Sequence, residues 1–187
     1  MSDRIKIFII DFEDSFTFNI ASELYNYEKN ILVISHTDFF SEKNFLNFSL
    51  EQIHPTAIVL GPGPGNPEEF RDYFFKIAEL KKFKNLFIMG ICLGHQILAL
   101  MDGYVVKSSI KPIHGGQVKI NFDDKNILVQ RYNSLAVYEK KDCTVEIQIR
   151  QWDRGVSYQF HPESIGTEDR HLFFKVLVSF LALSPAK

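Results

Sequence analysis

The chain has 187 residues, of which 45% are hydrophobic and 24% charged, and its formal net charge at pH 7 is −2. This length and composition predict one globular domain that spans residues 1–187 and buries a sizeable core. The near-neutral charge excludes a broad electrostatic surface for nucleic acid or for an anionic membrane, and no apolar run reaches the roughly 18 residues of a membrane span.

Strand-like and helical segments alternate along the first half of the chain, with a mixed connection between the second and third strands. This alternation predicts a mostly parallel, open α/β sheet with helices on both faces. Asp14 is positioned to cap the first helix. The expected strands are residues 5–10, 31–35, 57–60 and 86–89, and the expected helices are residues 15–27, 68–83 and 94–101.

The pattern changes between about residues 105 and 160. Short apolar segments with polar breaks predict a small antiparallel excursion, with strands at residues 117–120, 127–129 and 144–150. A strand at residues 156–160 follows, and a helix over about residues 168–183 closes the pattern. The N-terminus leads directly into the first strand, without the features of a signal peptide.

A cysteine stands where an apolar strand turns into a helix. Cys92 follows the strand at residues 86–89, and Gly90 and Gly94 flank it. Glycine removes the Cβ clashes of such a tight turn, and the N–H groups and dipole of the helix favour a thiolate. A buried structural cysteine needs neither glycine, so we predict that Cys92 is a nucleophile. Because its thiol must stay reduced, a cytoplasmic location is expected.

A histidine and a carboxylate follow the strand at residues 156–160. His161 and Glu163 are two residues apart, and side chains at that spacing in an extended segment point the same way. Glu163 can therefore orient the imidazole, which can take the thiol proton and return it to a leaving amine. A surface turn explains His-Pro-Glu equally well when the motif stands alone. Together with Cys92 it predicts a triad of nucleophile, base and carboxylate.

A Gly-Pro-rich loop at residues 61–67 also follows a predicted strand. Active sites in parallel sheets lie at the carboxyl ends of the strands, so this loop, Cys92 and His161 are expected to share one site. The loop lacks the Lys-Ser/Thr pair of a phosphate-binding loop, and no group of residues has metal-ligand spacing. We therefore predict neither a metal nor another cofactor.

Two motifs, Gly90-x-Cys92-x-Gly94-x-Gln96 and His161-x-Glu163, resemble those of the class I (triad) glutamine amidotransferases. Segments 11–19, 60–67 and 131–135 are similar to the glutaminase subunits of anthranilate synthase and aminodeoxychorismate synthase. The resemblance runs nearly from end to end. It implies the flavodoxin-like α/β architecture of that family and L-glutamine as the substrate.

The resemblance also implies how the oxyanion of the reaction is stabilised. Two backbone N–H donors normally bind the developing negative charge. Leu93, directly after the nucleophile, supplies one of them by its position. The resemblance assigns the other to the Gly-Pro-Gly loop, and within it we choose Gly63. Its missing side chain permits close approach, and its flanking residues, Pro62 and Pro64, limit the freedom of the loop.

Further residues are expected to hold the substrate glutamine. Gln96 lies one helical turn from Cys92, and by resemblance it binds the substrate, as does Gly63. The backbone of Ser134 and Leu135 matches the segment that binds the amino-acid end of glutamine in the family.

Other histidines and the second cysteine receive weaker assignments. His95 is interpreted as structural or as a support for the site. His114 is either a contact to a partner or a plain turn residue, and Cys143 is interpreted as structural. The sequence assigns no role to His36, His54 and His171.

Three departures from the family pattern stand out. The opening motif usually has Asn-Tyr where this chain has Phe12-Glu13. The Gly-Pro-rich loop usually begins with serine rather than Gly61, and the segment before Ser134 usually carries histidine rather than Asn133. None of them removes a triad residue, but each bears on coupling to a partner.

The resemblance predicts a subunit that hydrolyses glutamine through a thioester on Cys92 and passes ammonia to a chorismate-using synthase chain. The partner would make anthranilate, aminodeoxychorismate or both, and the sequence does not choose between them. Two alternatives stay open. One is a stand-alone cysteine hydrolase acting on γ-glutamyl compounds, and the other is a non-catalytic regulatory subunit with the same fold.

Overall fold

A six-stranded sheet forms the centre of the protein in a computed structural model that describes residues 4–50 and 54–182. The order of its strands is β2-β1-β3-β4-β8-β7. The first five pair in parallel, and β7 pairs antiparallel to β8 at the edge. The strands are β1 (Ile7–Asp11), β2 (Ile31–Ser35), β3 (Thr56–Leu60), β4 (Leu86–Ile91), β7 (Ile149–Trp152) and β8 (Gly155–Tyr158).

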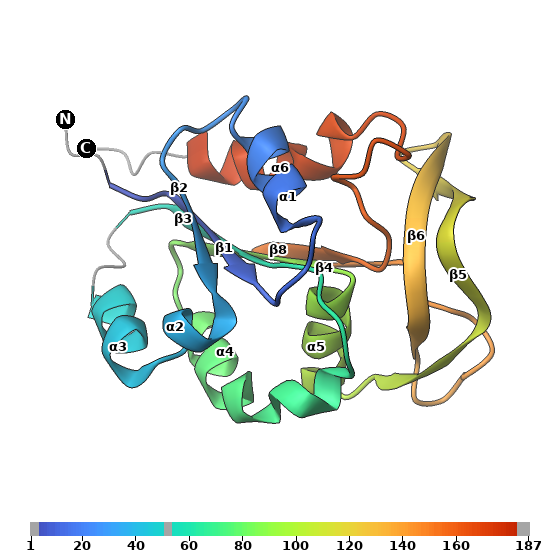
Figure 1. The fold of residues 1–187 in the computed structure, drawn as a ribbon, viewed down its shortest axis with the longest axis horizontal. Helices are drawn as coiled ribbons and strands as arrows, with labels where there is room; N and C mark the ends of the chain where they lie inside the picture. Colours follow the sequence, from blue (N-terminus) through green and yellow to red (C-terminus); the bar gives the residue numbers. More distant parts are fainter. Residues whose placement is uncertain (1–3, 51–53, 183–187) are drawn as a thin grey trace.

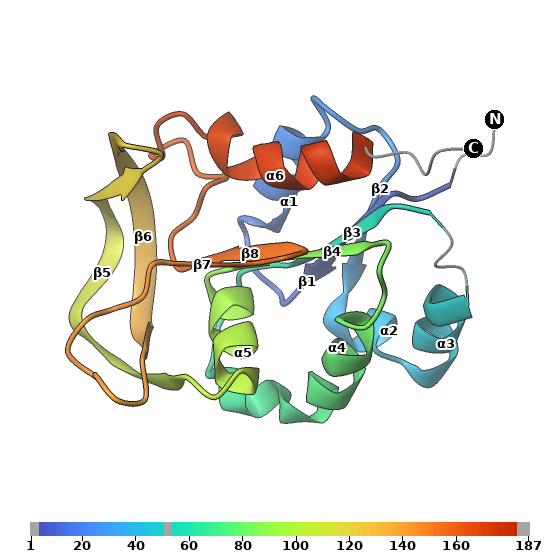
Figure 2. The ribbon, with the colours of Figure 1, turned by 180° about the vertical axis from the view of Figure 1, so that it is seen from behind.

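Helices cover both faces of this sheet (Figures 1 and 2). One face carries α1 (Thr17–Leu24) and α6 (His171–Ala182). The other carries α2 (His36–Phe39), α3 (Glu42–Leu50), the 3-10 helix η1 (Pro67–Tyr73), α4 (Phe74–Leu80) and α5 (Leu93–Met101). Within the described ranges no helix is long and apolar enough to cross a bilayer.

Alternate residues of the central strands belong to two separate hydrophobic cores, one on each face of the sheet. In β1, Ile9 belongs to the core shared with α1 and α6, whereas Ile10 belongs to the core shared with α4 and α5. Every residue of β3 and β4 is buried. This is the reason these strands are continuous apolar runs in the sequence, as expected for a sheet covered on both faces.

A long antiparallel hairpin stands beside the sheet, at the right of Figure 1. It consists of β5 (Val105–Phe122) and β6 (Lys125–Tyr138), joined by a two-residue turn. Asp123 and Asp124 both have positive φ, at 49° and 61°, which is the conformation of a type I′ hairpin turn. An isolated bridge between Gln130 and His161 ties β6 to the segment after β8.

The α/β class, the parallel sheet and the antiparallel excursion are confirmed, but two predicted helices differ in detail. Asp14 does not cap α1, because the cap residue is Phe16 and the Asp14 carboxylate accepts the Phe16 N–H at 2.8 Å instead. The helix predicted at residues 68–83 is observed as two consecutive helices, η1 and α4, that end at Leu80. It begins one residue earlier than predicted, at Pro67, behind a capping box on Asn66, and η1 contains a kink at Phe70.

The excursion is also more regular than predicted. The short strands expected at residues 117–120 and 127–129 are parts of β5 and β6, whose many exposed positions obscure the apolar pattern. Of residues 144–150 only the last two belong to a strand, β7, and β8 ends at Tyr158 rather than at residue 160. The closing helix begins at His171, and its predicted end at residue 183 lies outside the described residues. The mixed connection contains α2 and α3, which the sequence pattern did not indicate.

Candidate active site

Cys92 occupies a strained corner between β4 and α5. Its φ and ψ are 51° and −100°, and it is the N-cap residue of α5. A non-glycine residue in this region carries backbone strain that the surrounding structure must hold. A hydrogen bond of 2.8 Å from the Cys92 N–H to the Tyr158 carbonyl ties the corner to β8.

Both flanking glycines are required by contact distances. A Cβ on Gly94 would lie 2.1 Å from the carbonyl oxygen of Leu60, and a Cβ on Gly90 would lie 2.8 Å from the backbone of Gly94. Any side chain at either position would therefore push α5 away from the sheet. The corner that places Cys92 at the cavity depends on this close approach of helix and strand.

His161 and Glu163 form a buried pair. His161 Nδ1 and Glu163 Oε1 are 2.7 Å apart, and the two side chains are 3% and 0% exposed. The expected pairing is present, but its local cause differs, because residues 162 and 163 form a turn rather than an extended segment. Two hydrogen bonds hold the histidine backbone, from its N–H to Gln130 O at 2.8 Å and from Thr167 Oγ1 to its carbonyl at 2.6 Å.

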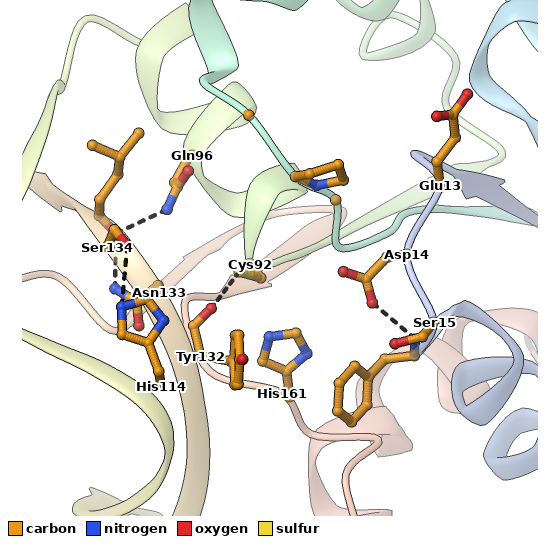
Figure 3. A pocket seen from close by; sticks show the side chains of 15 residues that line it. Glu13, Asp14, Ser15, Cys92, Gln96, His114, Tyr132, Asn133, Ser134 and His161 are labelled. Carbon is orange, nitrogen blue, oxygen red and sulfur yellow. Dashed lines mark hydrogen bonds between the residues drawn. The ribbon is translucent and has the colours of Figure 1, made fainter.

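The second imidazole nitrogen of His161 is available to Cys92. Within residues 4–50 and 54–182, Nε2 has no hydrogen-bond partner of standard geometry. The two side chains lie side by side in Figure 3 and line the same cavity. Burial by itself lowers the pKa of His161, but the neighbouring Cys92 and the hydrogen-bonded Glu163 carboxylate outweigh it, and the pKa lies well above its usual range. This nitrogen is therefore suited to carry a proton beside the sulfur.

The cavity has a volume of about 630 Å³ and opens at the carboxyl edge of the sheet. Loops after β1, β3, β4 and β8 contribute to it, together with β6 and His114 of β5. Such an edge is the usual position of an active site in a parallel sheet. The lining residues are Glu13, Asp14, Ser15, Phe16, Gly63, Pro64, Gly65, Cys92, Gln96, His114, Tyr132, Asn133, Ser134, Leu135 and His161.

Gly63 and Leu93 are brought together beside the corner. A Cβ on Gly63 would lie 2.6 Å from Leu93 Cδ2 and 2.6 Å from Phe12 Cβ, so only glycine fits between them. The Gly94 N–H donates to the Gly61 carbonyl at 3.2 Å and links the loop to α5. The structure thus places the two expected oxyanion donors on adjacent segments at the helix N-terminus.

The residues expected to hold glutamine also meet at this cavity. Gln96 Nε2 donates to the Leu135 carbonyl at 2.9 Å and to Gln159 Oε1 at 3.2 Å, so its amide nitrogen is engaged with the protein itself. Ser134 Oγ is 3.3 Å from His114 Nε2 (Figure 3). The exposed His114 therefore stands at the rim of the cavity rather than in an unrelated turn.

Three contacts of the site were missed by the sequence analysis. Gln159 Nε2 lies 3.8 Å from Cys92 Sγ, the Cys92 thiol lies 4.0 Å from the Tyr132 carbonyl, and the Phe16 ring is 5.1 Å from the His161 ring. Gln159 carried a usable signal, because it is two residues before His161, the spacing that also linked His161 to Glu163. The other two contacts depend on how separate segments fold together.

His95 is structural. It is fully buried, with Nδ1 2.9 Å from Ser157 Oγ and Nε2 3.1 Å from the Ile147 carbonyl. A carbonyl only accepts, so Nε2 carries the proton and Nδ1 accepts from the Ser157 hydroxyl. Burial and the charge of Arg150 lower the pKa of His95 to about 3, which keeps the ring neutral. Cys143 lies outside the site and contacts the Glu139 carbonyl at 3.4 Å.

Two residues that depart from the family pattern, Gly61 and Glu13, are constrained by their local surroundings. A Cβ on Gly61 would lie 2.8 Å from the Ile10 carbonyl oxygen, so the backbone here leaves no room for serine. Glu13 has a φ of 66°, and its loop is shaped by the Asp11 carboxylate, which accepts the N–H groups of Glu13 and Asp14 and the hydroxyl of Thr17. Among the described residues no group of three or more potential metal ligands occurs.

Comparison with known proteins identifies relatives of the whole chain. The family model "Glutamine amidotransferase class-I" matches residues 8–180. Anthranilate synthase component 2 of Saccharolobus solfataricus is 31% identical, over 92% of this chain and 96% of that protein. A putative aminodeoxychorismate synthase of Schizosaccharomyces pombe is 32% identical over 98% of this chain, but the chain spans only 27% of that protein.

Solved structures share the fold. A putative GMP synthase protein of Thermoplasma acidophilum superposes with a TM-score of 0.75 at 19% identity, over 97% of this chain and 96% of that one. A glutamine amidotransferase of Thermotoga maritima superposes with a TM-score of 0.64 at 16% identity, over 95% of each chain. At these identities the likeness concerns the arrangement of the backbone.

Proposed function

The chain belongs to the class I glutamine amidotransferase family, and we propose that it is the glutaminase subunit of a chorismate-using synthase. It hydrolyses L-glutamine and passes the ammonia to a separate synthase chain, which makes anthranilate, aminodeoxychorismate or both. The relatives named anthranilate synthase component 2 support this partner, since one of them matches over 96% of its own length. The observation that carries the proposal is the His161–Glu163 pair beside a cysteine on a strained helix corner.

Acylation begins with proton transfer between Cys92 and His161. The imidazole takes the thiol proton, and the thiolate attacks the side-chain amide carbon of glutamine. The oxyanion that forms is bound by the backbone N–H groups of Leu93 and Gly63. His161 then gives its proton to the amide nitrogen, and the C–N bond breaks. Ammonia is released, and a γ-glutamyl thioester remains on Cys92.

Deacylation repeats these steps with water. His161 takes a proton from the attacking water, whose oxygen bonds to the thioester carbon. The C–S bond breaks, glutamate leaves, and the Cys92 sulfur recovers the proton from the imidazolium. Glu163 holds the ring orientation and stabilises the imidazolium throughout, as the carboxylate of a hydrolytic triad does.

The amino-acid end of glutamine lies toward β6 in this proposal. Gln96 and the backbone of Ser134 and Leu135 line the cavity on that side, and Gly63 lines it beside the oxyanion position. Glu13, Asp14, Ser15 and His114 line the mouth, where the synthase chain docks and receives ammonia before bulk water protonates it. A cytoplasmic location keeps the Cys92 thiol reduced.

The test is synthesis by the complex of this chain with its chorismate-using partner, supplied with either glutamine or an ammonium salt. Cys92→Ala and Cys92→Ser should lose glutamine-dependent synthesis by at least about a thousandfold. Ammonium-dependent synthesis should persist, because the partner alone performs it. Cys143→Ala, the matched control at the other cysteine, should retain both activities.

Three results would replace the proposal. Residual glutamine-dependent turnover in the Cys92→Ala complex would remove Cys92 from the mechanism. Strong glutamine hydrolysis by the isolated chain, unchanged when a synthase chain is added, would favour a stand-alone γ-glutamyl hydrolase. Failure of glutamine analogues to alkylate Cys92 even in the complex would indicate a regulatory subunit without catalysis.

A further inference from the structure

The carbonyl of Leu135, a residue that lines the cavity, receives two side-chain hydrogen bonds. Gln96 Nε2 donates to it at 2.9 Å, and Asn133 Nδ2 donates to it at 2.8 Å (Figure 3). A backbone carbonyl with two fixed donors holds its peptide group in one orientation. Leu135 and its neighbour Ser134 line the cavity that also contains Cys92.

Asn133 is in turn held by a buried arginine. Arg131 Nε donates to Asn133 Oδ1 at 2.9 Å, and the two residues are 5% and 4% exposed. The guanidinium only donates and the Leu135 carbonyl only accepts, so the amide needs its oxygen on one side and its nitrogen on the other. Asn133 therefore uses one acceptor and one donor, and both are engaged with fixed partners.

The arginine is anchored by a carboxylate on another segment. Arg131 Nη2 and Glu146 Oε2 are 2.8 Å apart, with side chains that are 6% and 12% exposed. Glu146 also accepts from the Ile110 N–H at 3.0 Å, from Tyr138 Oη at 3.2 Å and from the Ser109 hydroxyl. A carboxylate with this many donors stays ionised and immobile. The chain of contacts thus runs from Glu146 through Arg131 and Asn133 to Leu135.

We propose that Asn133 is a positioning residue for the substrate, acting through the Leu135 peptide group on the strand segment that receives the amino-acid end of glutamine. This inference rests on the proposed glutaminase function. Asn133 does not touch the reacting atoms. Its effect falls on how well glutamine is held, and the reactivity of the Cys92 sulfur is left unchanged.

A comparison of asparagine, histidine and aspartate at position 133 distinguishes this positioning role from a role in general packing. Asparagine uses one donor and one acceptor here, and neutral histidine offers one of each, so Asn133→His keeps both contacts in kind. Aspartate offers only acceptors. In Asn133→Asp the carboxylate keeps the Arg131 contact, and even strengthens it by charge, but one oxygen then faces the Leu135 carbonyl without a proton between them. The aspartate variant is therefore expected to fold and to lose only the positioning contact.

The experiment compares two reagents that alkylate the same sulfur. 6-Diazo-5-oxo-L-norleucine has the amino-acid end of glutamine, and iodoacetamide does not. In the complex with the synthase chain, Asn133→Asp should lower the second-order rate constant for the glutamine analogue about tenfold, since one buried hydrogen bond is replaced by a repulsion. The iodoacetamide rate should stay within about twofold, and KM for glutamine should rise more than kcat falls.

The matched controls are Asn133→His and Asn121→Asp. Asn133→His should react with both reagents at nearly the wild-type rates. Asn121→Asp adds the same charge at an exposed position at the far end of the hairpin and should change neither rate. If Asn133→Asp does not fold, Arg131→Lys serves instead. It keeps a charge for Glu146 but loses the Nε donor to Asn133, and the glutamine-analogue rate should fall several-fold.

A folded Asn133→Asp complex with an unchanged glutamine-analogue rate would overturn the inference and leave the proposed function intact. An equal loss with both reagents would overturn it as well, because the defect would then lie in the sulfur or the fold. If the wild-type complex itself is not alkylated by the glutamine analogue, the glutaminase proposal fails and this inference fails with it.

Discussion

The side-chain amide of Gln159 directs its nitrogen toward the sulfur of Cys92, 3.8 Å away, in a buried contact. Its oxygen accepts the Gln96 amide at 3.2 Å, which fixes the orientation of the Gln159 side chain. The Gln159 amide therefore presents an N–H donor to the sulfur that acts as the nucleophile in the proposed reaction.

Replacing this donor should slow the nucleophile. Gln159→Leu has a similar size and no N–H, so alkylation of Cys92 by iodoacetamide near neutral pH should fall by about three- to tenfold. Gln151→Leu, at an exposed position of β7, is the control and should leave the rate unchanged. An unaltered rate in a folded Gln159→Leu variant would mean that the contact has no effect on the sulfur.

The Glu163 carboxylate should set the alkaline limit of activity. It raises the pKa of His161, together with the thiol contact and against the effect of burial. In Glu163→Gln the pKa falls, so the imidazolium is lost at a lower pH, and the alkaline limb of the kcat/KM profile should move to lower pH. The rate at the optimum should drop by roughly 100-fold or more, because the ring also loses its orientation.

Glu139→Gln, at an exposed position, is the control for removing one carboxylate and should keep the wild-type pH profile. A Glu163→Gln profile with an unshifted alkaline limb would show that the carboxylate does not support the imidazolium.

His95 should make the fold acid-sensitive. Its folded-state pKa is lowered from 6.5 to about 3 by burial and by the Arg150 charge. The neutral ring contributes full stability above the unfolded-state pKa of 6.5, and this contribution is lost as the pH falls toward 3, because only the unfolded chain takes up the proton. The expected slope is at most about 1.4 kcal/mol per pH unit.

Urea unfolding of wild type and His95→Gln at pH 7, 6 and 5 measures this contribution. Glutamine does not titrate, so the variant should be less stable at pH 7, but its free energy of unfolding should fall less steeply with decreasing pH. Parallel curves for the two proteins would contradict a buried, neutral His95.

Serine, which is usual at position 61 in the family, should lower the stability of this protein. Its Cβ would lie 2.8 Å from the Ile10 carbonyl oxygen, so Gly61→Ser and Gly61→Ala should each lower the free energy of unfolding by about 1–3 kcal/mol. The two variants should match, since the clash belongs to the Cβ that they share. Denaturant unfolding of both proteins tests this, and a stable Gly61→Ser variant would mean that the β1 and β3 ends separate easily.

The predictable parts of the fold were those with local causes. Ile31–Ser35 was predicted with its observed bounds, and the buried β3 and β4 were recognised as apolar runs. The long hairpin was not, because β5 is largely exposed and its hydrophobic alternation is weak. The 3-10 helix η1 and its kink at Phe70 were not predicted either, because helical periodicity does not distinguish a 3-10 turn from an α-helical one.

For the site, the amino-acid sequence alone determined the chemical types and their order. Three local patterns could be interpreted without coordinates: the glycines around Cys92, the spacing of His161 and Glu163, and the loop that contains Gly63. The tertiary structure alone decided the support around them. One example is the contact of Gln159 with the Cys92 sulfur, and another is the Arg131–Glu146 ion pair that supports Asn133. Both join residues from separate segments, so they form only when the packing of the whole sheet sets the distances.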